Sequence, residues 1–195
     1  QKNTLSAMTE QTDIMMARSI SLSEDITKEL NQCLTANGKT FSDLNDNPQL
    51  IMDLESALYP SLKSALDVKY CSGVFVVLDA TVNTKTEYAD TSRMGIYLRL
   101  SDLKAVNTSK QHVVFFRGNA DIARAEQVQL HNRWNLEFDT SALSGYEQIM
   151  QFDGNRLVES CLWTDRLELS DTWEDVQLLY VPVLDSTGKV RGLCG

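Results

Sequence analysis

Residues 5–34 contain neither glycine nor proline, and this uninterrupted stretch constrains the fold more than any other feature of the sequence. Apolar side chains recur through it at roughly helical spacing, at Leu5, Met8, Met15, Leu22, Ile26, Leu30 and Cys33. This spacing predicts a single long helix of about eight turns, which the Asn37-Gly38 pair ends.

Two interpretations of this helix remain open. Its first half is polar apart from a thin stripe formed by Met8, Met15 and Leu22, which are seven residues apart. The helix either covers the core of a globular domain, or projects as a stalk that pairs with a second copy through the stripe. In both cases the stripe is predicted to contact other protein surface.

A second helix is predicted to begin at Pro48. Asn47 can cap it, and proline is well suited to the first helical position. Leu50, Leu54 and Leu58 share one face, and Pro60 is expected to kink or restart the helix.

The rest of the chain has the pattern of strands. "GVFVVLDA" contains five consecutive apolar residues, which is typical of a strand buried on both faces, and "RMGIYLRL" alternates. The predicted strands are residues 73–80, 93–100, 112–118, 156–164, 176–183 and 189–195, with short helices near 119–127 and 141–152. The predicted fold class is α+β, a long N-terminal helix followed by a mostly antiparallel sheet with helices packed on one side. The expected units are a helix of residues 1–38 and a sheet domain of residues 39–195, which form one structural unit.

Composition excludes several functional classes. The 195 residues carry a net charge of −9 and contain no Lys/Arg cluster, so this portion is not expected to bind nucleic acid. No apolar run is long enough to span a membrane, and no signal peptide is present. The four cysteines are far apart and form no CxxC motif. They are expected to be buried thiols, with at most one disulfide, between Cys161 and Cys194.

Catalytic signatures are missing from the sequence. It has two histidines, neither near a nucleophile, and no phosphate-binding loop, nucleophile elbow, zinc motif or EF-hand spacing. Glu137 and Asp139 could act as an acid–base pair in a hydrolase, but this spacing is common. The chain is therefore predicted to be neither an enzyme nor a binder of metal or cofactor.

Aromatic and charged residues gather instead around predicted strand ends and loops. Small-ligand pockets combine aromatic walls with a few polar anchors, and arginine binds carboxylates in a bidentate manner. The candidate ligand-binding residues are Tyr97, Arg117, Trp134, Asp139, Trp163 and Asp165. In the alternative interpretation, the tryptophans plug the core beneath loops and the charges form surface pairs.

The chain ends in "PVLDSTGKVRGLCG", two strands around a turn in which glycine permits positive φ. With the two helices, the "VFVVLDA" strand and the helical segments within the sheet, this ending resembles the Cache family of PAS-like sensor domains. The part from Cys161 onward is most similar to single-Cache sensors of membrane-bound regulators in Firmicutes. The resemblance covers the whole chain in architecture.

Cache domains lie outside the bacterial membrane in chemoreceptors, histidine kinases and regulators, some with a cytoplasmic helix-turn-helix domain. The resemblance implies an extracytoplasmic sensor between two transmembrane helices. The stripe on the first helix predicts a homodimer through that helix. It implies a small polar or anionic ligand on the sheet face covered by residues 119–153. Amino-acid-binding members carry Tyr, Arg, Trp and Asp, which occur here at Arg93, Tyr97, Trp134 and Asp139 without the family spacing. The alternative is a dimerisation or protein-binding module without a small ligand.

Overall fold

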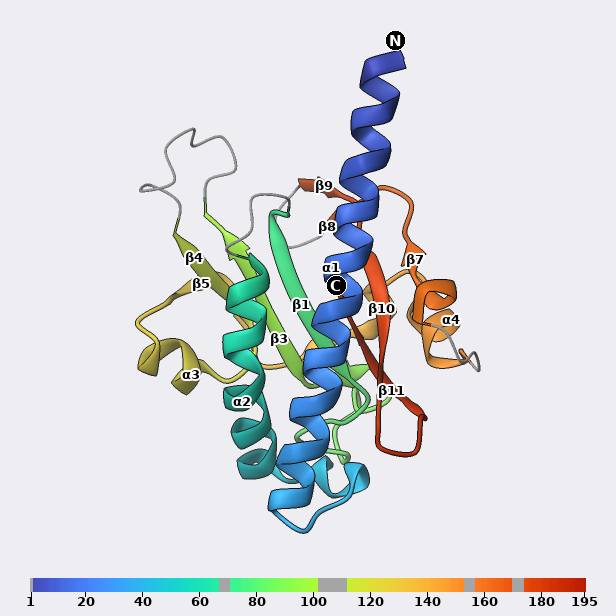
Figure 1. The fold of residues 1–195 in the computed structure, drawn as a ribbon. Coiled ribbons are helices and arrows are strands. Elements are labelled where there is room, and N and C mark those ends of the chain that lie inside the picture. Colours follow the sequence, from blue (N-terminus) through green and yellow to red (C-terminus); the bar gives the residue numbers. More distant parts are fainter. Residues whose placement is uncertain (1, 67–70, 102–111, 153–156, 170–173) are drawn as a thin grey trace.

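A computed structural model describes residues 2–66, 71–101, 112–152, 157–169 and 174–195, with the backbone alone at 2–8, 168, 169 and 174 (Figure 1). Its helices are α1 (Lys2–Ala36), η1 (Phe41–Leu44), α2 (Pro48–Leu66), α3 (Ala120–Ala125), η3 (Thr140–Ala142), α4 (Tyr146–Met150) and η4 (Leu157–Ser160). Its strands are β1 (Gly73–Leu78), β2 (Ser92–Arg93), β3 (Gly95–Leu100), β4 (Val113–Arg117), β5 (Gln129–Asn135), β6 (Phe138–Asp139), β7 (Leu162–Trp163), β8 (Leu167–Leu169), β9 (Glu174–Val176), β10 (Leu179–Leu184) and β11 (Val190–Cys194).

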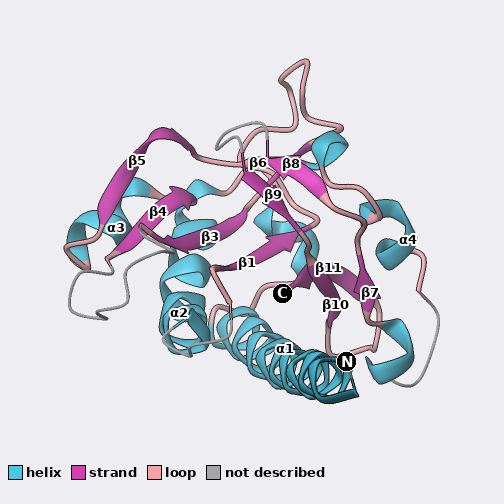
Figure 2. Cartoon of the chain, turned by 90° about the horizontal axis from the view of Figure 1, so that it is seen from above, coloured by secondary structure: helices cyan, strands magenta, loops and turns pink. Residues whose placement is uncertain are grey.

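Seven strands form the main sheet, in the order β5-β4-β3-β1-β11-β10-β7. All neighbours are antiparallel except β4 and β5, which are parallel. Two small ladders, β2–β6 and β8–β9, complete the described strands. Figure 2 shows α1 and α2 lying side by side along one face of the sheet. The predicted α+β class is confirmed.

The long helix is confirmed as α1, and Gly38 follows its end with φ of 61°. Its second half covers the sheet, because Leu22, Ile26, Leu30 and Leu34 are buried in the core. The first turns extend beyond the end of the sheet in Figure 1. Within the predicted stripe, Leu22 packs into the core, Met15 is half-buried, and the Met8 side chain lies outside the described residues.

The second helix begins as predicted, with the Asn47 side chain accepting a hydrogen bond from the Leu50 amide at 3.2 Å. The helix does not restart at Pro60, since α2 continues to Leu66. Pro60 is exposed, so the Ser56 carbonyl that loses its helical donor can bond to water. Leu58 and Leu62, on either side of Pro60, are fully buried and hold the helix against the sheet.

Side chains cover both faces of the sheet centre. Val74, Val76 and Leu78 of β1 enter the larger core beneath α1 and α2. Phe75 and Val77 enter a smaller core on the opposite face. Phe138, Tyr146 and Ile149 cover this second face, so α4 packs opposite α1 and α2. The expectation of helices on one side only is therefore corrected, while the doubly buried first strand is confirmed.

The predicted strand over residues 156–164 is mostly wrong. Residue 156 lies outside the described residues, and Leu157–Ser160 form a 3₁₀ turn before the short strand β7. The Ser160 hydroxyl donates to the Leu157 carbonyl at 2.6 Å, and the Cys161 thiol donates to the same oxygen at 3.4 Å. These local hydrogen bonds compete with strand pairing. The alternating hydrophobicity of the sequence does not reveal this competition.

All four cysteines are free thiols, and the predicted Cys161–Cys194 disulfide does not form. Cys194 pairs with Val181 of β10, whose neighbour Tyr180 pairs with Leu162 of β7. Continuing that register places Cys161 opposite Val181, so β10 separates the two cysteines. Two strand spacings amount to about 10 Å between their Cα atoms, beyond the roughly 7 Å limit for a disulfide.

We therefore expect thiol titration of the denatured, unreduced protein to count four reactive groups per chain. Burial raises the pKa of the Cys33, Cys71, Cys161 and Cys194 thiols, which keeps them protonated and slow to oxidise in the folded state. A sample reduced before denaturation serves as the reference. Two titratable thiols in the unreduced sample would contradict the strand register.

Candidate functional site

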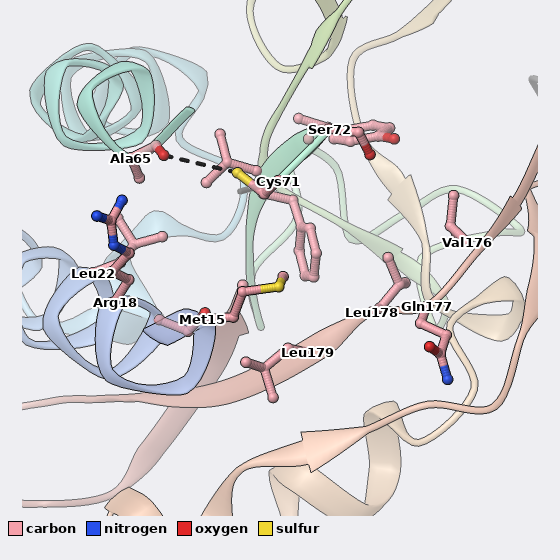
Figure 3. Close-up of a pocket in the computed structure, with 16 residues that line it drawn as sticks. Met15, Arg18, Leu22, Ala65, Cys71, Ser72, Val176, Gln177, Leu178 and Leu179 are labelled. Atoms are coloured by element: carbon pink, nitrogen blue, oxygen red, sulfur yellow. Dashed lines mark hydrogen bonds between the residues drawn. The ribbon is translucent and has the colours of Figure 1, made fainter. Parts of the chain in front are cut away.

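A cavity of about 200 Å³ lies between the first half of α1 and one end of the sheet (Figure 3). α1 contributes Met15, Arg18, Ser19 and Leu22 to its wall, and Ala65 of α2 lies beside them. The remaining wall comes from the start of β1, from Tyr97 of β3, from residues 176–179 and from Gly195. The cavity therefore joins segments from both ends of the sequence.

Helical periodicity explains the contribution of α1. Met15, Ser19 and Leu22 lie four and three residues apart, so they share one helix face. Figure 3 shows Met15 extending from α1 toward Leu178. Opposite it, Gly195 exchanges two backbone hydrogen bonds with Phe75, at 2.9 and 3.1 Å, which hold the last residue against the start of β1. The Cys71 thiol contacts the Ala65 carbonyl at 3.8 Å, linking the end of α2 to this wall.

The cavity wall is mainly apolar, and Arg18 is the only charged side chain among the described residues that line it. Figure 3 places its guanidinium between α1 and Ala65. Burial raises the pKa of the Cys71 thiol, and the smaller effect of Arg18 lowers it. Cys71 therefore remains a thiol rather than a nucleophilic thiolate.

A chain of aromatic rings leads from the cavity across β3 and β4. The Tyr97 ring lies 5.2 Å from that of Phe116, between ring centroids, and Phe116 stacks on His131 at 4.0 Å and 19°. The Arg99 guanidinium lies 5.8 Å from the centroid of Phe116. Arg99 is only 4% exposed, so this cation is part of the packing rather than an open anchor.

A second, wider hollow of about 460 Å³ lies between the 82–92 loop and residues 135–139. Glu137 accepts hydrogen bonds there from the Val82 amide at 2.7 Å, from the Thr81 hydroxyl at 3.0 Å, and from the Ser92 hydroxyl. Asp139 caps η3 by accepting from the amide and hydroxyl of Ser141, at 3.0 and 2.6 Å. Both carboxylates considered for acid–base work are thus engaged in holding loops.

The structure does not bring the six predicted ligand-binding residues into one pocket. Tyr97 lines the cavity, and Arg117 is its cross-strand neighbour on β4. The Arg117 guanidinium donates to the carbonyls of Phe116 and Arg133, at 2.9 and 3.1 Å. Trp134 packs against the core on the helix side, and its indole donates to the Gly118 carbonyl at 3.0 Å.

The other three predicted residues are distributed over separate regions. Asp139 lies at the second hollow, and Asp165 is exposed in the loop after β7. Trp163 pairs with Leu179 at the edge of the sheet. Its indole nitrogen is buried and has no hydrogen-bond partner among the described residues. The sequence did not reveal this distribution, because the order of predicted strands does not show which face of the sheet each aromatic side chain takes.

Sequence reasoning missed most of the cavity residues. The stripe that contains Met15 and Leu22 was a usable signal, because it required a contact for this face of α1. Arg18 gave no signal, since a single arginine on a polar helix is ordinary. Ser72 and Gln177 also line the cavity, through the ends of β1 and β9, which become neighbours only in the folded sheet.

In the described residues, no helix combines the length and apolarity needed to cross a membrane. The same residues contain no cluster of three or more His, Cys, Asp or Glu side chains suited to a metal ion. Comparison of the chain with known protein families, curated proteins and solved structures finds no match.

Proposed function

We propose that this chain is the extracytoplasmic sensor domain of a membrane-bound bacterial signal-transduction protein and belongs to the PAS-like Cache type. In this proposal a small polar or anionic molecule occupies the cavity beneath α1. The main observation that supports the proposal is that one cavity is lined both by α1 and by Gly195, which follows the last strand. An occupant would contact α1 and the last described residue at once.

The order of the main sheet supports a PAS-like fold. PAS-like domains pair their first and last strands at the centre of an antiparallel sheet. Here β1 lies between β3 and β11, and β10 follows β11. The additional strands β4 and β5 extend the sheet on the β3 side.

The proposed mechanism is a population shift and needs no chemical step. A ligand that contacts Met15 and Leu22 together with Leu179 favours the arrangement in which α1 is tightly packed on the sheet. The first turns of α1, which extend beyond the sheet, would carry that change toward the membrane (Figure 1). Hydrophobic segments before residue 1 and after residue 195 of the full-length protein are what this location requires.

A homodimer through α1 is part of the proposal, and dimerisation without a small ligand is the second candidate function. Ile14 and Met16, in the first half of α1, are half-buried rather than fully covered. Apolar side chains on a projecting helix favour a second helix as partner. Sedimentation of the chain at several concentrations measures this association independently of any ligand.

The variant Ala65→Phe tests the ligand cavity by filling it. In a thermal-shift screen of small metabolites, we expect hits that stabilise the wild-type protein and lose that effect in Ala65→Phe, because the phenyl ring occupies their volume. A ligand at 100 times its Kd contributes about 2.7 kcal/mol to the stability of the wild type. Ala125→Phe is the matched control, since Ala125 is exposed at the end of α3. Hits that stabilise both variants equally would place the ligand site elsewhere.

A further inference from the structure

We infer that the second hollow, of about 460 Å³, is a separate binding site that takes a neutral saccharide. In this site the Tyr88 ring packs on a sugar ring, and the side chains of Asn83, Asn135 and Asp139 bond to its hydroxyl groups. The inference depends neither on the cavity beneath α1 nor on the function proposed for it. It follows from a fixed loop, an exposed aromatic ring, and polar groups whose remaining hydrogen-bonding capacity matches that of hydroxyls.

Hydrogen bonds fix the loop that forms one wall of the hollow. The carboxylate of Asp46, between η1 and α2, accepts from the amide and the hydroxyl of Thr84 at 2.8 and 2.6 Å. Further along the loop, the Tyr88 carbonyl accepts from the amides of Thr91 and Ser92 at 3.1 and 2.9 Å. A wall that is ordered before binding loses little conformational entropy when a ligand arrives.

Tyr88 is exposed although it lies on this fixed loop. Its side chain lines the hollow and is 67% exposed, so the ring contributes little buried surface to the fold. Leu136 and Phe138 add apolar surface to the same hollow. The face of an aromatic ring carries partial negative charge, and the C–H groups of a sugar ring carry partial positive charge, so the two surfaces attract each other.

Two asparagine side chains in the wall have a fixed orientation. The Oδ1 atom of Asn83 accepts from the Lys85 amide at 3.0 Å, and that of Asn135 accepts from the Leu136 amide at 2.8 Å. These bonds identify the oxygen of each side chain and hold its NH₂ group in place. Neither NH₂ group donates to another group in the described part of the chain. The hollow is therefore lined by two oriented donors that are available to a ligand.

Asp139 supplies an acceptor in the same wall. Its Oδ1 atom accepts from the amide and the hydroxyl of Ser141, which orients the carboxylate, and its Oδ2 atom has no donor among the residues that the structure describes. A sugar hydroxyl is both a donor and an acceptor. Neighbouring hydroxyls can therefore accept from an asparagine NH₂ group and donate to this carboxylate.

Charge and volume narrow the ligand class. Glu137 and Asp139 both line the hollow, and the whole chain carries a charge of −9, so an anionic sugar is repelled. A volume of about 460 Å³ lies within the range of small-molecule sites, roughly 300–1,000 Å³. This is room for a neutral monosaccharide, either free or at the end of a longer glycan.

The hollow is distinct from the cavity beneath α1. The bonds between Asp46 and Thr84 place the loop beside the segment that joins α1 to α2, at the end of α1 away from the N-terminus (Figure 1). The cavity adjoins the first half of α1, and the two sites share no lining residue. Each site can therefore be altered without changing the other.

The probes are the methyl glycosides of glucose, galactose, mannose and N-acetylglucosamine, titrated against the 195-residue chain and followed by saturation-transfer NMR. We expect at least one of them to bind, and glucuronate to bind more weakly than methyl glucoside. Tyr88→Ala should raise the Kd of the bound glycoside about tenfold or more. The double variant Asn83→Asp/Asn135→Asp should have a similar effect, because it removes both NH₂ donors but keeps the oxygens that bond to Lys85 and Leu136.

Val158→Ala is the matched control for Tyr88→Ala, because it truncates another exposed apolar side chain, 61% exposed on η4. Tyr88→Ala keeps the backbone carbonyl that fixes the loop, so melting temperatures equal to that of the wild type are expected for both variants. The inference is overturned if none of the four glycosides binds, if Tyr88→Ala binds as tightly as the wild type, or if glucuronate binds as tightly as methyl glucoside.

Ala65→Phe separates this inference from the proposed function. The glycoside should bind Ala65→Phe as tightly as the wild type, because Ala65 lines only the cavity beneath α1. Binding that is lost in Ala65→Phe and kept in Tyr88→Ala would place the sugar in that cavity and overturn the saccharide site. A failure of all four glycosides leaves the test of the cavity by the metabolite screen unaffected.

Discussion

Replacement of Gly95 by alanine is expected to lower the free energy of unfolding by about 3 kcal/mol or more. Gly95 opens β3 with φ of 154°, a conformation that residues with a side chain rarely adopt. A Cβ atom at this position would lie 2.0 Å from the Val76 carbonyl oxygen and 3.0 Å from the Phe138 ring. β1 and β3 would have to separate at the centre of the sheet, where both faces are packed. Urea denaturation followed by circular dichroism measures the loss.

Gly38→Ala is the control for Gly95→Ala. Gly38 also has a positive φ, 61°, but no atom lies within 4 Å of the position of its Cβ. Its replacement should cost about 1–2 kcal/mol, the strain of the left-handed conformation alone. The difference between the two variants isolates the clash with β1. Equal losses would mean that the sheet adapts to a Cβ at residue 95.

The second large effect is a loss of stability between about pH 4.5 and pH 8 that originates from Glu55. This side chain is fully buried beneath α2, and its carboxyl group accepts from the Asn119 amide at 2.8 Å and the Gly95 amide at 3.3 Å. Burial raises the pKa of Glu55 from 4.5 to about 8, against the opposing effect of the two amides, and Glu137 adds a small further rise.

A raised pKa means that the folded protein keeps a proton that the unfolded chain releases above pH 4.5. The contribution of Glu55 is therefore fully present below pH 4.5 and is lost as pH rises through about 8. The slope attributable to this group is at most about 1.4 kcal/mol per pH unit. Urea denaturation at a series of pH values measures it.

Glu55→Gln provides the comparison, because its side chain has the same shape, keeps an acceptor for one of the two amides, and has no charge at any pH. The difference in unfolding free energy between the wild type and the variant should change with pH in this interval. Taking this difference cancels the contributions of the other titratable groups. Glu147→Gln, at an exposed position on α4, should leave the wild-type dependence unchanged. A constant difference between the wild type and Glu55→Gln across the interval would rule out this titration.

Local patterns in the sequence predicted the elements whose stability is mainly local. The absence of glycine and proline predicted α1, the alternation at residues 94–100 predicted β3, and "DSTGK" predicted the turn between β10 and β11. The burial of Glu55 is a feature that such local patterns do not predict. Within an amphipathic helix its carboxylate looks like an ordinary surface group, and the amides of Gly95 and Asn119 that receive it come from distant segments.

The candidate site was less predictable than the fold. Of the six residues chosen from the sequence, Tyr97 alone lines the cavity beneath α1. Tryptophan is common in pocket walls, yet Trp134 packs against the core, and its indole N–H donates a hydrogen bond to the Gly118 carbonyl. The cavity depends on how α1 crosses the sheet and on which residues meet at the end of β1. Neither is encoded in the spacing of residues within a single element.

The central position of β1 has a consequence for synthesis on the ribosome. β1 is made early, but its neighbour β11 is made after every other described strand. Until β11 leaves the exit tunnel, one edge of β1 remains unpaired, with Val76 and Val77 on opposite sides of an open strand. α1 meets the same delay, because the Ser23 hydroxyl bonds to the Pro182 carbonyl, 159 residues away. The sheet therefore closes only after β11 has left the exit tunnel, and the nascent chain must avoid aggregation while its central strand waits for its partner.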